Sequence, residues 1–174
     1  MSNKSLDIAK DLLPDSSRAV ADNMAAITLK KPELKKVFLE VAFTNQYPWN
    51  MRSANILEKA DELQPGFLKN DISFIVDSIP KATHDGTKRC LMKALGRYNL
   101  CEDDEICGKC AEFSFNFLKS ATEAIAVRYH ALNILEQIIK TYPDLKHELY
   151  QISLLYKDEV DKGLKVHFRK VLNI

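Results

Sequence analysis

The segment MRSANIL at residues 51–57 has a pattern that recurs three times further along the chain, and this repeat indicates the fold. The later copies are KRCLMKAL at 88–95, VRYHALNIL at 127–135 and FRKVL at 168–172. Every copy has an arginine followed by aliphatic residues, and successive arginines are 37, 39 and 41 residues apart. An apolar helical pattern precedes each copy, so the repeating unit is a pair of helices.

A period of about 40 residues with two helices per unit is typical of HEAT and armadillo repeats. One helical hairpin cannot bury its apolar face alone, whereas stacked hairpins share a continuous core. Small residues at Ala54, Ala94 and Ala131 let neighbouring helices approach closely. We therefore predict an all-α fold, an α-α superhelix of stacked HEAT-like hairpins that forms a single domain over residues 1–174. The alternative is an unrelated helical bundle in which the arginine pattern recurs by chance.

Apolar residues recur at helical spacing through most of the chain, and strand-like alternation is missing, so no sheet is predicted. The stripe from Leu34 to Ala42 marks one buried helix face. The segment from Ala124 to Ile139 is apolar almost all round, which predicts a helix covered on more than one side. The predicted helices lie near residues 4–13, 16–28, 32–44, 49–62, 67–79, 85–98, 103–119, 122–141, 144–161 and 163–174.

The chain from Asp15 to Ile174 resembles a group of small, uncharacterised bacterial HEAT/armadillo-like helical repeat proteins. The resembling pieces are PEL at 32–34, WNMRSA at 49–54, LEK at 57–59, HDGTKR at 84–89, AIAVRYHA at 124–131 and YPDLK at 142–146. The resemblance implies a superhelical fold and supplies no activity. The segment CGKC at 107–110 departs from the usual sequence of the group.

Composition excludes several classes of protein. The 174 residues carry 25 basic and 24 acidic side chains, a net charge of +1 that gives no global attraction for nucleic acid or an anionic membrane. The first ten residues are polar and lack the apolar core of a secretory signal, and no apolar run is long enough to span a bilayer. Four cysteines in such a chain predict reduced thiols and a cytoplasmic location.

The cysteines are the first candidates for chemistry. Cys101, Cys107 and Cys110 form a C-x5-C-x2-C pattern, to which Cys90 or His84 can add a fourth ligand. Zinc needs four such ligands in a tetrahedron, usually on a turn, whereas this pattern lies inside a predicted helix. A redox pair lacks the βαβ context that usually accompanies it. We therefore predict buried, inert thiols, with no metal and no cofactor.

The predicted binding surface lies on the second helix of each pair, where the basic residues gather. In solenoids such a helix lines the concave face, or an edge, where extended partners bind. Guanidinium groups there can pair with acidic peptides or phosphate. The alternative is structural, with each arginine pairing with the neighbouring repeat and locking the stack. The candidate binding residues are Trp49, Arg52, Lys88, Arg89, Arg128, His130 and Arg169.

No set of residues assembles a recognisable active site, so we predict a non-enzymatic module that binds a protein or peptide partner. The alternative function is nucleic-acid binding, because the DNA alkylation-repair glycosylases share this general architecture. The chain is shorter and nearly neutral, and their catalytic motif has no match in it. A continuous basic trough would favour nucleic acid, whereas a mixed apolar groove would favour a peptide.

Overall fold

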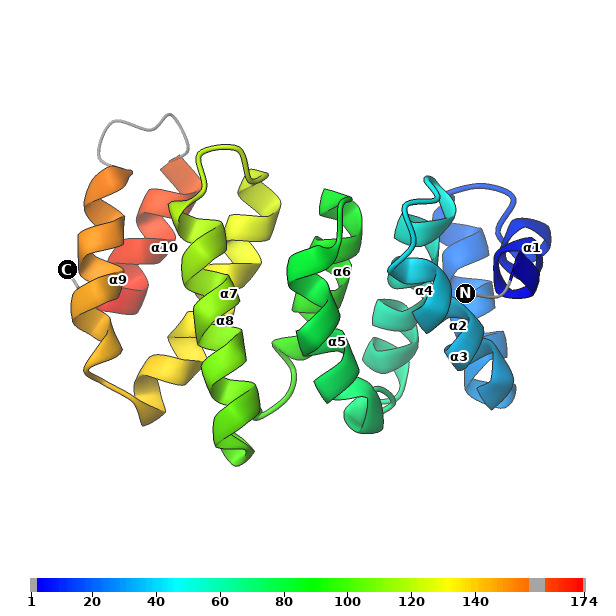
Figure 1. The fold of residues 1–174 in the computed structure, drawn as a ribbon, viewed down its shortest axis with the longest axis horizontal. Coiled ribbons are helices and arrows are strands. Elements are labelled where there is room, and N and C mark those ends of the chain that lie inside the picture. Colours follow the sequence, from blue (N-terminus) through cyan, green and yellow to red (C-terminus); the bar gives the residue numbers. More distant parts are fainter. Residues whose placement is uncertain (1–2, 157–161, 174) are drawn as a thin grey trace. The chain divides into compact units, whose positions relative to one another are not determined.

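The computed structural model describes residues 3–156 and 162–173, and every regular element in these ranges is a helix. Figure 1 shows the helices in chain order. The α-helices are α1 (Asn3–Leu12), α2 (Arg18–Lys30), α3 (Pro32–Ala42), α4 (Trp49–Leu63), α5 (Ile72–Ser78), α6 (Asp85–Leu95), α7 (Asp104–Lys119), α8 (Ile125–Thr141), α9 (Leu145–Leu155) and α10 (Lys162–Leu172). Short 3-10 turns are η1 (Lys69–Asp71), η2 (Ile79–Lys81) and η3 (Leu100–Glu102). The all-α prediction is confirmed.

Each predicted helical range overlaps one of these α-helices, and the differences lie at the ends. The helix predicted over 67–79 is split into η1, α5 and η2, because Pro65 and Gly66 form a turn and Pro80 interrupts its end. The helix predicted over 144–161 ends at Leu155 as α9, and its last five predicted residues, 157–161, lie outside the described ranges. Within those ranges, no helix has both the length and the apolar content needed to cross a bilayer.

Local chemistry explains where several helices begin. Pro32 occupies the first turn of α3, where a missing N–H costs little. Ser17 caps α2 by accepting a hydrogen bond from the Val20 amide. The acidic run before α7 acts in the same way, because the Asp103 carboxylate accepts from the amides of residues 105 and 106.

The chain divides into two compact units, residues 1–98 and residues 99–174. The first unit contains α1 to α6, in which α3 and α4 form a hairpin and α1 packs against α3. The second unit contains α7–α8 and α9–α10. In the first unit α4 packs against α2, α3 and α6, and in the second unit α8 packs against α7 and α10.

Polar contacts in the first unit join α2 to α4 at a separation close to the sequence period. Arg52, in the first turn of α4, donates to the Leu13 carbonyl oxygen before α2, at 2.7 Å and 39 residues away. Lys59, further along α4, pairs with Asp22 of α2, 37 residues away. The contacts advance in step along both helices, so α2 and α4 run parallel in successive repeats.

The same relation holds between α4 and α6. Thr83, just before α6, donates to Asn45 Oδ1, just before α4, at 2.8 Å and 38 residues away. Arg97, just after α6, pairs with Asp61 in the last turn of α4, 36 residues away. The second helices of the first unit therefore lie parallel to one another. The residues joined by these hydrogen bonds are separated by about one predicted repeat.

The second unit repeats this arrangement between its first helices, α7 and α9. Tyr142, before α9, donates to Asp104 Oδ1 at the start of α7, at 2.6 Å and 38 residues away. Tyr156, after α9, donates to the Leu118 carbonyl oxygen near the end of α7, also 38 residues away. The helix α8 is buried on several sides, as predicted, and its aliphatic side chains Val127, Ala131, Leu132, Ile134, Leu135, Ile138 and Ile139 are all in the core.

Candidate functional site

Arg52 is a structural side chain in the first turn of α4. Its guanidinium donates to the Leu13 carbonyl at 2.7 Å and to Ser16 Oγ at 3.0 Å. Both acceptors lie in the connection between α1 and α2, so Arg52 ties this connection to the next hairpin. Charge-assisted bonds of this kind are stronger than bonds between neutral groups.

Arg89 shares a groove with Arg52 but lies on α6 and is exposed. The groove, which we call the first-unit groove, has a volume of about 160 Å³. Its apolar lining comes mainly from Leu13, Val20, Met51 and Ile56. Its polar lining includes Asp15, Arg52, Asn55 and Arg89. It is therefore a mixed apolar groove with charges of both signs.

The three charged side chains of the first-unit groove differ in their hydrogen-bond partners. The Asp15 carboxylate accepts from the Ser17 amide at 2.7 Å, and hydrogen bonds with Ser17 hold the pKa of Asp15 below its usual range. Arg52 is held by the α1–α2 connection, as described above. Arg89 makes a long contact, 3.6 Å, from Nη2 to Cys90 Sγ. The exposed guanidinium of Arg89 is thus the group in the groove that can best pair with an incoming carboxylate.

Aromatic residues flank the same ends of α4 and α6. Trp49 is half-buried at the start of α4, with Lys10 Nζ 5.6 Å from its ring centroid. Tyr47 is 62% exposed and stacks on His84, with ring centroids 4.8 Å apart. His84 in turn caps α6 by accepting from the Gly86 amide at 3.0 Å. His84 therefore starts α6 and also stacks on the exposed Tyr47 ring.

The remaining candidate of the first unit is Lys88. It lies on α6 next to Arg89 and is half-buried, and it does not line the first-unit groove. Two of the four candidates in this unit, Arg52 and Arg89, thus share one groove. Trp49 and Lys88 lie on the same two helices, outside it.

Arg128 of the second unit is buried, with 5% of its surface exposed, in the first turn of α8. Its Nη2 donates to the Ser120 carbonyl at 2.7 Å, and its guanidinium lies 5.6 Å from the Tyr156 ring centroid. Like Arg52, it holds a preceding connection in place. His130, on the same helix, makes an edge contact with the Tyr129 ring at 5.7 Å between centroids.

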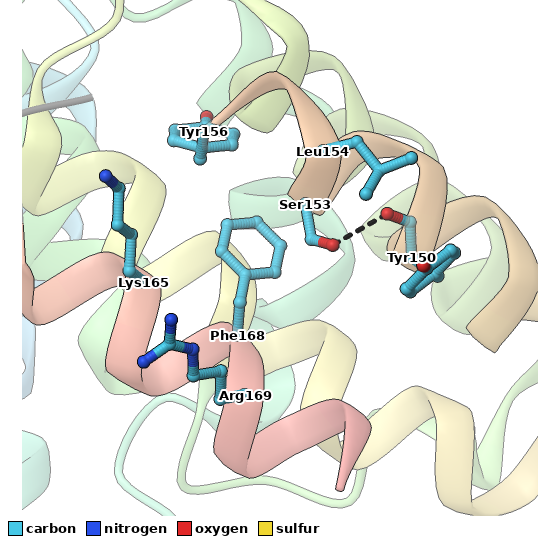
Figure 2. Close-up of a pocket in the computed structure, with 7 residues that line it drawn as sticks. All are labelled: Tyr150, Ser153, Leu154, Tyr156, Lys165, Phe168 and Arg169. Carbon is cyan, nitrogen blue, oxygen red and sulfur yellow. Dashed lines mark hydrogen bonds between the residues drawn. The ribbon is translucent and has the colours of Figure 1, made fainter. Parts of the chain in front are cut away.

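Arg169 is exposed on α10 and lines a pocket of about 270 Å³ between α9 and α10. Figure 2 shows this pocket, with Lys165, Phe168 and Arg169 on α10 facing Ser153 and Tyr150 on α9. Reasoning from sequence did not assemble this site. The spacing of Lys165 and Arg169, four residues apart on one helix, is the sequence signal from which this pocket could have been predicted.

The cysteines correct one expectation. The structure joins Cys101 of η3 to Cys107 of α7 in a disulfide, so the prediction of unpaired thiols is wrong for this pair. Cys90 and Cys110 are free and buried, and burial raises the pKa of Cys90 to about 11 and that of Cys110 to about 12. A thiol with so high a pKa is a poor nucleophile at neutral pH. The described side chains contain no group of three histidine, cysteine or acidic residues that could hold a metal ion.

A buried polar cluster in the first unit was also missed. Asp61 is fully buried and accepts from the Leu68 amide at 3.2 Å, from the Tyr98 hydroxyl and from Arg97. Arg97 also pairs with buried Glu58 of α4. Burial and the hydrogen bond to Asp61 raise the pKa of Tyr98. The cluster joins α4 to the residues that follow α6, and its polar groups are engaged with one another, so it serves the fold rather than a ligand.

Comparison with known proteins gives one match. Searches of curated proteins and of solved structures each found nothing similar to the chain. The model of the HEAT repeat domain matches residues 8–174, a range that covers nearly the whole sequence and includes residues of both units. The HEAT-like hairpins expected from the arginine period are thereby confirmed, and the chain belongs to the HEAT repeat domain family.

Proposed function

We propose that this helical-repeat scaffold is a non-enzymatic interaction module that binds a short peptide segment of a partner protein in the first-unit groove. The observation that carries the proposal is the mixed lining of the groove, in which aliphatic side chains lie beside the exposed guanidinium of Arg89. Recognition surfaces of HEAT-type solenoids usually hold extended partners.

The chemistry of the groove defines the peptide. The aliphatic lining of Leu13, Val20 and Ile56 favours one apolar side chain of the peptide. Arg89 favours an acidic residue next to it, since a guanidinium pairs with a carboxylate through two parallel hydrogen bonds. The Asp15 carboxylate, which lies in the same lining, opposes a second acidic residue. The preferred segment is thus apolar with a single acid.

The nucleic-acid alternative finds no support. Binding of a phosphate backbone depends on lysine and arginine side chains that neutralise several phosphates. In the first-unit groove one of the two arginines is already engaged by the α1–α2 connection, and Asp15 adds a negative charge.

Two further parts of the proposal rest on sequence. We treat the two units as one domain, because a single family model spans residues of both. We also keep the cytoplasm as the site of action. The Cys101–Cys107 disulfide does not support this location, because disulfides are rare in cytoplasmic proteins.

The test is a selection of random seven-residue peptides on the purified chain, followed by affinity measurements on two variants. Arg89→Glu reverses the charge in the groove, and Lys36→Glu makes the same change at an exposed position of α3 outside it. We expect selected peptides to pair an apolar residue with an acid. Their affinity should fall about tenfold or more in Arg89→Glu, since a charge-assisted pair is replaced by repulsion, and should change less than about twofold in Lys36→Glu.

Two outcomes would overturn the proposal. One is a selection that enriches no common peptide. The other is a set of peptides that bind wild type and Arg89→Glu equally. Salt-dependent binding of a DNA duplex by the same preparation would favour the nucleic-acid alternative instead.

A further inference from the structure

We propose that Ser16, in the connection between α1 and α2, is a phosphorylation site whose phosphate group is held by Arg52 and Arg89 in the first-unit groove. Ser16 and both arginines line this groove. The consequence for peptide binding rests on the function proposed above, whereas the phosphate site itself does not.

Ser16 is open to a modifying enzyme. Residues 13–17 belong to no helix, and Ser16 is exposed, as residues of surface connections usually are. Its Oγ accepts a hydrogen bond from Arg52 Nε at 3.0 Å, so the oxygen that receives the phosphate already lies beside a guanidinium. The neighbouring Ser17 differs, because its hydroxyl accepts from the Val20 amide and caps α2.

The modification itself is a phosphoryl transfer catalysed by a protein kinase, with a nucleoside triphosphate as the donor. The bond between Ser16 Oγ and the γ-phosphorus forms while the bond from that phosphorus to the β–γ bridging oxygen breaks. The serine proton is released, and a nucleoside diphosphate leaves. The product carries about −1.5 to −2 charges at pH 7 and three strong acceptor oxygens, which a guanidinium can bind in pairs.

Arg52 can hold this phosphate without giving up its structural role. Its bonds to Ser16 Oγ and to the Leu13 carbonyl use two of the five N–H donors of a guanidinium. Because Ser16 belongs to the connection that Arg52 already ties down, the phosphate arrives beside Arg52 and leaves the bond to Leu13 in place. Ser16 also lies two residues before α2, whose positive end favours an anion.

Arg89 supplies the second cation from α6. It is exposed, it lines the same groove, and its contact with Cys90 Sγ is long, at 3.6 Å. Asp15, the acid of the groove, opposes the phosphate. However, the Asp15 carboxylate already accepts from the Ser17 amide at 2.7 Å, and the two arginines outnumber it.

Phosphorylation changes the sign of the charge in the groove. One acid and two arginines among the described lining residues give a net charge of +1. A phosphate on Ser16 turns this into a negative charge of about −0.5 to −1. Arg89 is then paired within the chain, and the groove repels the acidic peptide that unmodified Arg89 attracts.

The first experiment examines whether Ser16 is modified in the cell. Trypsin cuts after Lys10 and Arg18 and releases DLLPDSSR, residues 11–18. Mass spectrometry of the chain isolated from the cells that produce it, both growing and starved, should find phosphate on Ser16, with fragment ions separating it from Ser17. A phosphate on Ser17 alone, or an unmodified peptide under both conditions, overturns the proposal.

The second experiment measures how the phosphate is held and involves no peptide. The chain is made with phosphoserine in place of Ser16, or, as a control, in place of Ser73, which is exposed on α5 and does not line the groove. Titration by phosphorus NMR should give a second phosphate pKa about 0.5 unit or more lower at position 16, because neighbouring cations favour the dianion.

Two variants show whether Arg89 is responsible. Arg89→Gln should raise the phosphate pKa at position 16 toward that of the control, whereas Lys36→Gln, at an exposed position of α3 outside the groove, should leave it unchanged. Equal pKa values at positions 16 and 73 overturn the phosphate site, and so does a pKa at position 16 that Arg89→Gln leaves unchanged.

The third experiment measures the effect on the selected peptides. Their affinity should fall about tenfold or more with phosphoserine at position 16 and should change less than about twofold with phosphoserine at position 73. Equal affinity for the phosphorylated and unmodified chains overturns the regulation and leaves peptide binding in the groove standing. A selection that enriches no peptide overturns the proposed function, while the phosphorus titration still decides the phosphate site.

Discussion

At the scale of single residues, Asp61 shows how much a buried carboxylate contributes when its partners are in place. It is fully buried and accepts hydrogen bonds from the Leu68 amide, Tyr98 and Arg97. Asp61→Ala leaves these donors without their acceptor, so we expect the free energy of unfolding to fall by about 2–4 kcal/mol in urea denaturation.

Asp22→Ala is the matched control for this prediction. Asp22 pairs with Arg18 and Lys59 but is half exposed, so its loss should lower the free energy of unfolding much less than the loss of Asp61. Equal losses in the two variants would contradict the structural role given to the Asp61 cluster.

His167 gives a prediction for pH dependence. Burial lowers the pKa of His167 from its usual 6.5, against the opposing effect of Glu136 at 3.5 Å, while the positive charge of Lys170 lowers it further. The unfolded chain therefore binds the proton more tightly than the folded chain. The stability that comes from neutral His167 is complete above about pH 6.5 and is lost as the pH falls from there toward the lowered pKa.

Thermal unfolding between pH 7.5 and pH 5 measures this effect. The melting temperature of the wild type should fall over this range, and His167→Gln should show a smaller fall. His147→Gln, which changes an exposed histidine of α9, should behave as the wild type does. An identical pH dependence in His167→Gln and the wild type would contradict the assignment.

At the scale of elements, two glycines are predicted to respond to alanine in opposite directions. Gly66 has a φ of +90°, a conformation that alanine adopts only with strain, so Gly66→Ala should lose about 1 kcal/mol of unfolding free energy. Gly108 lies inside α7 with no atom within 4 Å of an added Cβ, so Gly108→Ala should gain about 0.5–1 kcal/mol. Urea denaturation of both variants checks the pair, and effects of the same sign would contradict these conformations.

The link between η3 and α7 can be checked by counting thiols. Of the four cysteines, Cys101 and Cys107 are bonded, while Cys90 and Cys110 are free. Protein purified without reductant, denatured and alkylated should therefore carry two labels per chain, and four after reduction. Four labels without reductant would show that the bond does not form under these conditions.

Helix positions were the part of the structure that sequence predicted best. Helical spacing predicted both α3 and α8. The positions of the apolar residues indicate whether one face of a helix is buried, as in α3, or several faces, as in α8. The break between α4 and α5 was placed correctly at Pro65 and Gly66, but the late start of α5 at Ile72 was missed, because residues 67–71 form a turn and the 3-10 segment η1. The disulfide was missed for a different reason, because sequence separation alone does not give the distance between two sulfur atoms.

At the scale of the whole molecule, the arginine period predicted the repeat but not the binding site. Arg52, Arg89, Arg128 and Arg169 look equivalent in the sequence, yet Arg52 and Arg128 donate to backbone carbonyls of preceding connections. Arg89 and Arg169 are exposed and line a groove and a pocket. The difference depends on which carbonyl or cavity each connection places beside the arginine, and a repeat pattern carries no such information.

The family assignment and the internal contacts agree on this organisation. The HEAT repeat domain model matches residues 8–174, and several polar contacts between successive repeats join residues 36–39 apart within each unit. Repeats of this kind share one architecture, while the residues at their exposed positions vary. The function of such a protein therefore depends on the side chains that line its own groove.

The most direct test of the account is a charge-swap cycle between Arg89 and the acidic residue of a selected peptide. Four affinities are measured: the wild type and Arg89→Glu, each with the acidic peptide and with a peptide in which lysine replaces the acid. If Arg89 pairs with that acid, the lysine peptide should bind Arg89→Glu more tightly than the acidic peptide does, with a coupling energy of at least about 1 kcal/mol. Strictly additive effects of the two changes would show that the peptide does not meet Arg89 and would contradict the assignment of the first-unit groove as the binding site.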